Sequence, residues 1–377
     1  ELQGHGGMIL QQQLLTRVFE LGANQAVAGE FSARAFDNDK LDLVQAEAIA
    51  DAIDATSVAA AKSAMRSLTG EFSQKINALL EQLIQLRLYV EAAIDFPDEE
   101  GVDFLADEHI AKQLRQVCEQ LNNVLATAKQ GQLLRDGVSV VIAGRPNAGK
   151  SSLLNRLAGQ ERAIVTDIAG TTRDILQETI VLNGLTLNLT DTAGLRHTDD
   201  IVEQAGIERA RQAITQADLL LMVYDAHREH EPLRLATELF GSLPNANSIL
   251  MIANKIDLSD NHQNLPKQFS SQEQIYHPVY VSCKYGTGLE ELVNQICDKV
   301  GFHPPENSLI ARTRHLDALR RTQMALQEAD EQLHLFHAGE LVAESLRQAQ
   351  LSLNEITGEF TADDLLGKIF GSFCIGK

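Results

Sequence analysis

Apolar side chains recur along the chain with two different spacings. Over residues 41–94 they return every three or four positions, as in "LDLVQAEAIADAIDA" and "INALLEQLIQLRLYVEAAI", which predicts amphipathic helix. The stretch "DFPDEEGVDF" breaks this pattern with Pro and Gly, and a further helix is predicted over residues 108–129. Helical spacing returns over residues 309–338, 340–357 and 362–373. Helices are therefore predicted on both sides of the middle of the chain.

The period changes at Gly137. The runs "VSVVIAG", "TLNLTDTAG", "LLLMVYDA" and "SILMIANKID" are short and apolar, and loop and helical sequence follows each of them. Such alternation predicts a parallel sheet with helices on both faces. This α/β segment ends near Gly301, and residues 1–35 resemble the tail of a further domain. We predict an α/β domain inserted into one helical domain built from both flanks; two separate helical domains are the alternative.

Composition narrows the class of protein. The 377 residues suffice for two or three domains, and the formal net charge of −20 argues against broad binding to nucleic acid or to an anionic membrane. The cysteines are widely spaced, which favours reduced thiols over a zinc site or disulfides. No apolar run is long enough to span a membrane, so a cytoplasmic protein is expected. The chain opens without Met, and we interpret it as the remainder of a longer protein.

The stretch "GRPNAGKS" fits the pattern G-x-x-x-x-G-K-[ST] and lies between a predicted strand and a predicted helix. Backbone N–H groups of such a loop surround phosphates at a helix N-terminus. Lys150 is expected to contact the β- and γ-phosphates, and Ser151 to bind Mg²⁺. In "AGTTRD", Thr172 would complete the Mg²⁺ site, and in "DTAG", Asp191 would reach the ion through water while Gly194 turns its N–H to the γ-phosphate.

Two later motifs indicate guanine. Asp257 of "NKID" would accept hydrogen bonds from the guanine edge in a pattern that adenine cannot supply, and "SCK", residues 282–284, would support the base. Five motifs in order, each at a strand end, predict a Ras-like P-loop GTPase.

The sequence lacks the glutamine that orients the attacking water in Ras-like proteins. Leu195 and Arg196 follow the "DTAG" motif instead, so another group must serve. Glu203 is a candidate for orienting the water, although the residues alone favour an ordinary position on a helix surface. Without this glutamine, an arginine from a partner or a monovalent cation could also supply the missing catalytic group.

Longer stretches resemble one family. "GEFSARAFDNDKLDLVQAEAIADAIDA", "DTAGLR" and the final "FCIGK" are similar to the tRNA-modification GTPases of the MnmE (TrmE) family, and the resemblance covers essentially the whole chain. It implies a remnant of an α+β folate-binding and dimerisation domain (1–35), a helical domain (36–136 and 302–377) and an inserted G domain (137–301). It also implies a homodimer that works with the flavoprotein MnmG (GidA), which carries FAD, in a heterotetramer or larger complex.

The implied activity is K⁺-dependent GTP hydrolysis coupled to tRNA modification. The two proteins would add an aminomethyl or carboxymethylaminomethyl group to carbon 5 of the wobble uridine, with 5,10-methylene- or 5-formyl-tetrahydrofolate as cofactor. A K⁺ ion would stand where an arginine finger stands elsewhere, and Glu203 would act through a second water, with Arg196 in a switch region. The family implies K⁺ contacts by Asn147, Thr166, Ile168 and Thr171.

The same resemblance supplies the remaining site residues. Lys40, Lys377 and Glu1 match positions associated with folate, and Cys374 matches an active-site thiol, although an inert cysteine is the ordinary expectation. The nucleotide-binding residues implied are Asn147, Ala148, Gly149, Lys150, Ser151, Ser152, Thr166, Asp167, Ile168, Ala169, Gly170, Thr171, Thr172, Asp191, Thr192, Ala193, Gly194, Asn254, Lys255, Asp257, Ser282, Cys283 and Lys284.

Two other functions fit a GTP-binding chain. One is a switch for assembly of the ribosome or another RNA complex without modification chemistry, as in the Era and Der families. Those relatives add basic RNA-binding domains, whereas this chain has an acidic helical part and the "CIGK" ending. The other is a scaffold for a separate enzyme.

Overall fold

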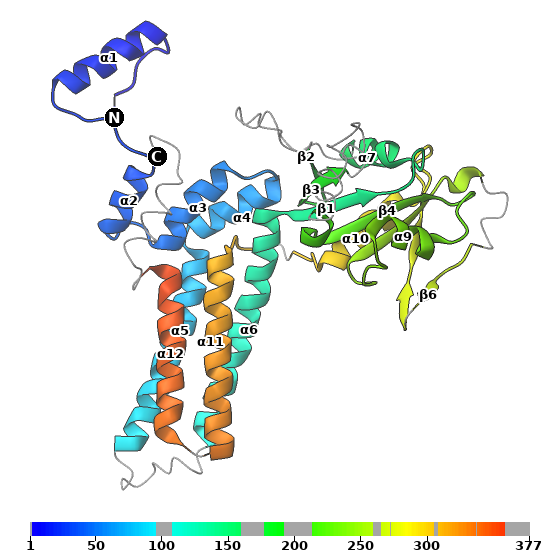
Figure 1. Cartoon of the computed structure of the whole chain (residues 1–377). Coiled ribbons are helices and arrows are strands. Elements are labelled where there is room, and N and C mark those ends of the chain that lie inside the picture. The colour runs from blue at the N-terminus through cyan, green and yellow to red at the C-terminus, as the bar shows by residue number, and fades with distance from the viewer. Residues whose placement is uncertain are drawn as a thin grey trace.

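The computed structural model describes residues 2–95, 108–159, 177–191, 213–258, 265–271, 273–304, 308–336 and 338–358. Figure 1 shows an elongated helical body with an α/β domain beside one of its ends.

Helices from both flanks of the sequence form a single body. Four of them run lengthwise side by side in Figure 1: α5 (Glu71–Asp95), α6 (Glu108–Asp136), α11 (Thr313–Glu331) and α12 (Gly339–Thr357). One hydrophobic cluster contains Leu83 and Leu114 from the first flank together with Leu316 and Leu346 from the second. The prediction of one helical domain is therefore confirmed, and the alternative of two separate helical domains is wrong.

Polar caps divide the helical stretch 41–94 into α3 (Leu43–Ile53), α4 (Val58–Leu68) and α5. Asp42 and Gln45 form a capping box at the start of α3, and the Ser57 hydroxyl accepts from Ala60 N at the start of α4. Gly70 separates α4 from α5 with a φ of 90°. Apolar spacing alone does not reveal these breaks, since it continues through them.

Six strands form one sheet among the described residues, in the order β2–β3–β1–β4–β5–β8. They are β1 (Val138–Ala143), β2 (Gln177–Leu182), β3 (Leu185–Asp191), β4 (Leu219–Asp225), β5 (Ile249–Asn254) and β8 (Pro278–Tyr280). The β2–β3 pair is an antiparallel hairpin, and the other pairs are parallel. A short ribbon, β6 (Phe269–Ser271) with β7 (Gln274–Tyr276), lies apart from this sheet.

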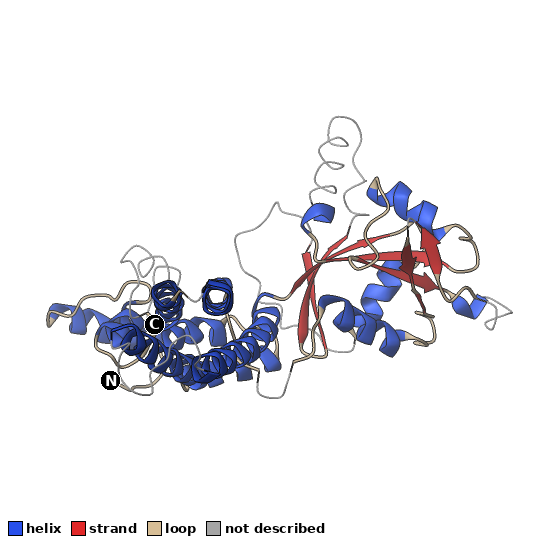
Figure 2. Cartoon of the chain, turned by 90° about the horizontal axis from the view of Figure 1, so that it is seen from below, coloured by secondary structure: helices blue, strands red, loops and turns tan. Residues whose placement is uncertain are grey.

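Helices cover both faces of the sheet, as Figure 2 shows. They are α7 (Lys150–Ala158), α9 (Pro232–Phe240) and α10 (Leu289–Val300). Alternate residues of β1 face opposite sides: Ile142 clusters with Leu153 of α7, whereas Val141 clusters with Leu235 of α9. The predicted α/β domain with a mainly parallel sheet is thus confirmed.

The chain enters and leaves the α/β domain at neighbouring points. A Cβ on Gly131 of α6 would lie 1.7 Å from the carbonyl oxygen of Leu309, so only glycine allows this crossing. Gln130 donates to Gly301 O at 2.8 Å and accepts from His303 N at 2.8 Å. The last turns of α6 therefore hold the segment that returns to the helical body.

A buried carboxylate on α3 joins both crossings. Asp51, with a side chain 5% exposed, accepts from Arg135 Nε at 2.8 Å and from Arg312 Nη2 at 2.8 Å. Arg135 belongs to the last turn of α6, and Arg312 precedes α11. Asp51 thereby links the entry and the exit of the α/β domain to the helical body.

A second buried carboxylate, Glu47, fixes the end of α12. Its oxygens accept from Arg314 Nε at 2.8 Å and Nη2 at 2.7 Å, and His315 Nε2 lies 3.1 Å away. The same guanidinium donates to the carbonyl oxygen of Ile356 at 3.1 Å. This cluster ties α3 to α11 and to the last turn of α12.

The turn of the β2–β3 hairpin lies against the start of α4. The Ser57 hydroxyl contacts Gly184 O at 3.1 Å, and the hydroxyls of Thr56 and Thr186 are 2.8 Å apart. A Cβ on Gly184 would come within 3.1 Å of Ala59 Cβ. The helical body therefore contacts the α/β domain at the hairpin as well as at the two crossings.

The first helix, α1 (Met8–Glu20), contains no buried residue, and α2 (Glu30–Asp37) lies close to α3. The sequence pattern assigned residues 1–35 to the tail of a further domain and did not single out a helix over 8–20. None of the helices in the described ranges combines the length and the apolarity that crossing a membrane requires.

Candidate nucleotide-binding site

The loop between β1 and α7 approaches two neighbouring segments so closely that side chains are excluded. A Cβ on Gly144 would lie 2.2 Å from Val223 O, and one on Gly149, which has a φ of 100°, would lie 2.1 Å from Asn254 Nδ2. Gly149 is the N-cap of α7 and provides no side-chain cap. The first N–H groups of α7 are left for an anion, as phosphate binding requires.

Lys150 folds back onto this loop. Its ammonium donates to the carbonyl oxygens of Gly144 at 3.0 Å and Arg145 at 3.3 Å, and the side chain is buried. Ser151 and Ser152 are exposed in the first turn of α7, and Asn147 is exposed with a φ of 64°. The six predicted phosphate-loop residues, 147–152, are thus brought together by one strand–loop–helix unit.

The motifs predicted for guanine meet at the ends of β5 and β8. Asn254 connects them to the phosphate loop, since its Nδ2 donates to Ala148 O at 3.0 Å and its Oδ1 accepts from Cys283 N at 3.2 Å. Asp257 accepts from Ser282 Oγ at 2.6 Å. A hollow of about 560 Å³ beside them is lined by Asp257, Ser282 and Tyr285, among others. The carboxylate that would read the base is therefore held in a fixed orientation.

Asp225, at the end of β4, holds the lysine of the guanine motif. Lys255 has a φ of 65°, and its Nζ lies 2.8 Å from Asp225 Oδ2. Burial alone would raise the pKa of Asp225, but the hydrogen bonds from Lys255 and from the N–H of His227, with the positive charges of Lys255 and Arg228, together outweigh burial and lower this pKa. The sequence analysis missed Asp225; the signal for it is a carboxylate at the end of the apolar run "LLLMVYD".

Several predicted residues lie outside the described part of the chain. Asp191 ends β3 and is paired in register with Ile142, which places its backbone beside the strand that leads into the phosphate loop. The predicted residues that fall outside the description are Glu1, Thr166, Asp167, Ile168, Ala169, Gly170, Thr171, Thr172, Thr192, Ala193, Gly194, Arg196, Glu203, Cys374 and Lys377.

Lys40, predicted to contact folate, lines a second hollow of about 510 Å³ with Asn77 and Gly358, among others. Gly358 follows α12 with a φ of 95°, and a Cβ there would lie 2.9 Å from Leu43 Cβ. The hollow therefore lies where α12 ends, and the chain continues from this point toward the predicted Cys374 and Lys377.

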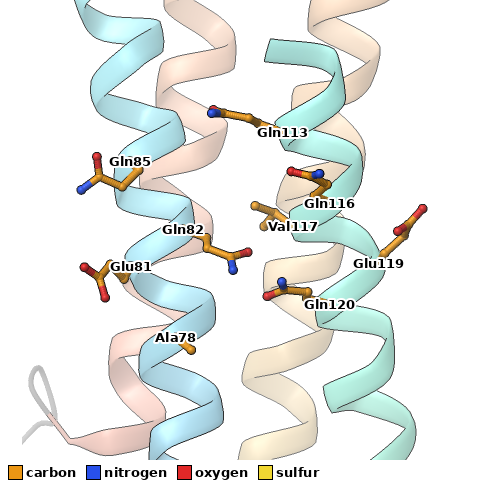
Figure 3. Close-up of a pocket in the computed structure, with 9 residues that line it drawn as sticks. All are labelled: Ala78, Glu81, Gln82, Gln85, Gln113, Gln116, Val117, Glu119 and Gln120. Carbon is orange, nitrogen blue, oxygen red and sulfur yellow. The ribbon is translucent and has the colours of Figure 1, made fainter. Parts of the chain in front are cut away.

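A third hollow, of about 640 Å³, lies between α5 and α6 and is lined mainly by amide side chains such as Gln82, Gln116 and Gln120 (Figure 3). None of the predicted site residues lines it. The thiols of the described cysteines are unsuited to nucleophilic chemistry, because burial raises the pKa of Cys118, Cys283 and Cys297.

Comparison with known proteins assigns the family. The family model "MnmE helical domain" matches residues 43–374, and "GTP-binding protein TrmE N-terminus" matches residues 1–40. A protein of Psychrobacter arcticus named tRNA modification GTPase MnmE is 74% identical over 100% of this chain and 80% of its own length. The chain belongs to the MnmE family. Proteins of the same name from Acinetobacter baylyi and Pseudomonas aeruginosa are 63% and 55% identical, again over 100% of this chain and over 80% and 82% of their own lengths.

Solved structures overlap with only part of the chain. Era of Aquifex aeolicus bound to GDP·AlF4⁻ is 26% identical over 50% of this chain and 66% of its own, with a TM-score of 0.33. The sequence relatives carry the family assignment. As a member of the MnmE family, the chain is a GTP hydrolase of tRNA modification, which confirms the family resemblance and the enzyme class predicted from the sequence.

Proposed function

We propose that this MnmE-family chain hydrolyses GTP in a K⁺-dependent manner and, as a homodimer with the flavoprotein MnmG, couples hydrolysis to modification of carbon 5 of the wobble uridine in tRNA. The proposal rests on one observation: the same chain contains a GTP-binding type of site and the helical body of the MnmE family. Asn254 joins the phosphate loop to Cys283, whose neighbour Ser282 holds the carboxylate of Asp257. This site stands beside a helical body that matches the MnmE helical domain. FAD would be carried by MnmG, and a tetrahydrofolate would supply the one-carbon unit.

The phosphate loop offers oxygen ligands of the kind that both cations prefer. The exposed Asn147 lies in the loop, and the exposed Ser151 follows Lys150 in the first turn of α7. Asn147 would hold K⁺ through its amide oxygen together with Thr166, Ile168 and Thr171, and Ser151 would hold Mg²⁺ together with Thr172. Bound K⁺ would supply positive charge beside the phosphates, where charge develops during hydrolysis. Asn254, Asp257 and Ser282 would hold the base, and Glu203 would orient water.

Exchange of the monovalent cation tests the K⁺ site. GTP hydrolysis is expected to be faster in K⁺ than in Na⁺ by at least about tenfold, since one well-placed positive charge contributes at least this much. Asn147→Ala should remove most of the difference between the two salts, while GDP affinity, measured by calorimetry, stays within about threefold because Asn147 is not among the base contacts. Equal rates in both salts for the unaltered protein would refute the K⁺ site.

The hollow at the end of α12 supports the folate proposal. Its lining includes Lys40 and the amides of Gln45 and Asn77, together with the carboxylates Asp37, Asp39 and Asp42, and it lies at Gly358, the last described residue after α12. Lysine ammonium groups suit the carboxylates of a folate, and a thiol near lysines can act as a nucleophile on the uracil ring. Lys40 and Lys377 would bind, and Cys374 would attack or hold the base.

Nucleoside analysis of tRNA from cells lacking the gene tests the function as a whole. Loss of a modified wobble uridine, restored by the unaltered gene, is the expected result. Complementation with Cys374→Ser should fail to restore the nucleoside although the purified variant still hydrolyses GTP. Unchanged nucleosides in the deletion strain would favour the assembly switch, and full complementation by Cys374→Ser would favour the scaffold.

A further inference from the structure

One side chain outside every sequence motif joins the two halves of the nucleotide site. Arg156 lies in the last turn of α7, the helix that begins at the phosphate loop. Its Nε donates to the carbonyl oxygen of Cys283 at 2.9 Å, and its Nη2 donates to the carbonyl oxygen of Lys284 at 2.8 Å. A single planar guanidinium therefore holds two consecutive carbonyls of the loop predicted to support guanine.

The other bonds of this loop fix its ends and leave these two carbonyls to Arg156. Ser282 N donates to Thr287 O at 2.9 Å, and Gly286 N donates to Ser282 O at 2.7 Å. The N–H of Cys283 is held by Asn254 Oδ1 at 3.2 Å. Arg156 therefore orients the peptide units that follow Cys283 and Lys284 by holding their carbonyl oxygens.

The planar peptide bond between Cys283 and Lys284 then determines where the N–H of Lys284 points. The carbonyl of Cys283 and the N–H of Lys284 belong to one planar trans unit and point in opposite directions. While Arg156 holds the oxygen on one side, the N–H must face the other side. Among the described residues no acceptor is bonded to the Lys284 N–H, so it is available in the loop whose Ser282 also holds Asp257.

The N–H of Lys284 and the carboxylate of Asp257 offer one donor and one acceptor, which matches the edge of guanine. Guanine presents the acceptor O6 and the donor N2–H₂, whereas adenine presents an amino donor in place of O6. A fixed N–H would donate to the O6 of guanine and disfavour the amino group of adenine, because there two donors would face each other. An N–H that swings with its peptide would discriminate less.

We propose that Arg156 is a positioning residue for guanine recognition: it holds the peptide unit between Cys283 and Lys284 so that its N–H meets the guanine O6. The residue touches no part of the nucleotide. It acts from the phosphate-side helix, so the two halves of the site are also kept at a constant spacing.

The test measures affinities of the full chain for GDP, IDP and ADP by fluorescence competition. Inosine keeps O6 but lacks the N2 amino group, so it isolates the O6 contact. For Arg156→Ala, the Kd values of GDP and IDP are expected to rise by the same factor, about fivefold for partly exposed hydrogen bonds from a charged group, while that of ADP is unchanged. Arg156→Lys should give an intermediate loss, because one ammonium cannot reproduce the two-pronged contact.

The kinetic readout separates positioning from chemistry. In Arg156→Ala the KM for GTP is expected to rise by a similar factor while kcat is retained. Arg320 is an exposed arginine of α11 that pairs with Asp317, and the control variant Arg320→Ala should change neither constant. Unchanged GDP affinity in Arg156→Ala, or equal loss of GDP and ADP, would overturn the proposal. Circular dichroism establishes folding, and Arg156→Lys carries the test if the alanine variant fails to fold. GDP binding needs neither K⁺ nor tRNA, so this outcome is independent of the proposed function.

Discussion

Single side chains show most clearly how this protein tolerates buried charge. A carboxylate removed from water is stable only where paired donors replace the lost hydration. Burial alone would raise the pKa of Glu47, but hydrogen bonds from His315 and Arg314 outweigh burial and hold this pKa well below its ordinary range. Burial lowers the pKa of His315 despite its hydrogen bond with Glu47. The pair therefore consists of an ionised glutamate and a neutral histidine at pH 7.

Acidification should weaken this cluster in two steps. His315 is neutral when folded, so the unfolded chain gains a proton first, and stability is lost as the pH falls below about 6.5. The depressed pKa of Glu47 contributes stability that is complete above the ordinary glutamate value of about 4.3 and is lost as the pH falls toward the folded value. Urea unfolding between pH 8 and pH 4 measures the first step, and its extension to about pH 2.5 measures the second. His315→Gln should remove the first step, and its persistence in that variant would assign it to another group.

Glu47→Gln is expected to lower the free energy of unfolding by about 3 kcal/mol, because Arg314 loses its buried counter-charge. Glu355→Gln is the matched control, since Glu355 also faces an arginine, Arg321, but both side chains are more than 40% exposed. It should cost less than about 1 kcal/mol. If urea unfolding at pH 7 showed the same loss of unfolding free energy for Glu47→Gln and Glu355→Gln, burial of Glu47 would not be what makes it important.

At the scale of elements, α6 can cross the segment around Leu309 only because residue 131 is a glycine. Gly→Ala inside a helix usually stabilises it by about 1 kcal/mol. Gly131→Ala is expected to do the opposite and cost about 2 kcal/mol or more, because its Cβ would overlap Leu309 O. Gly159→Ala, at a helical φ of −75° with its nearest contact at 3.3 Å, should be close to neutral. Thermal unfolding of both variants checks the sign, and a stabilised Gly131→Ala would show that the crossing is looser than described.

Elements and motifs differ in how far the sequence predicts them. The apolar runs of β1, β4 and β5 and the phosphate loop are local patterns, so the sequence analysis found them. The breaks at Ser57 and Gly70 depend on caps within a continuous apolar spacing, and the analysis missed them. It missed Asp225 and Arg156 for another reason. Their partners are 30 and at least 127 positions away in the sequence, and no local pattern marks such pairs.

At the scale of the whole molecule, Asp51 is one of the contacts through which the α/β domain and the helical body share stability, together with the hairpin contacts of Thr56 and Ser57. It binds one arginine from each crossing of the chain. Asp51→Asn is therefore expected to separate unfolding of the α/β domain from that of the helical body. Scanning calorimetry should resolve two transitions, of which only one shifts with added GDP, because a ligand stabilises only the unit that binds it.

Asp136→Asn provides the control for this experiment. Asp136 also accepts from Arg135, at 2.5 Å, but it is 37% exposed and has no contact with the Arg312 side of the joint. It should leave the number of transitions unchanged. Two transitions already present in the unaltered protein would show that Asp51 does not couple the bodies.

The insertion also sets an order of events during synthesis. Domains form as the ribosome releases them, N-terminal parts first. The helices α5 and α6 emerge before the α/β domain, whereas α11 and α12, which cover their apolar faces, emerge after it. A nascent chain can thus hold a finished nucleotide pocket while Leu83 and Leu114 still face water. During that interval the half-built helical body is the part of the protein that needs protection from aggregation.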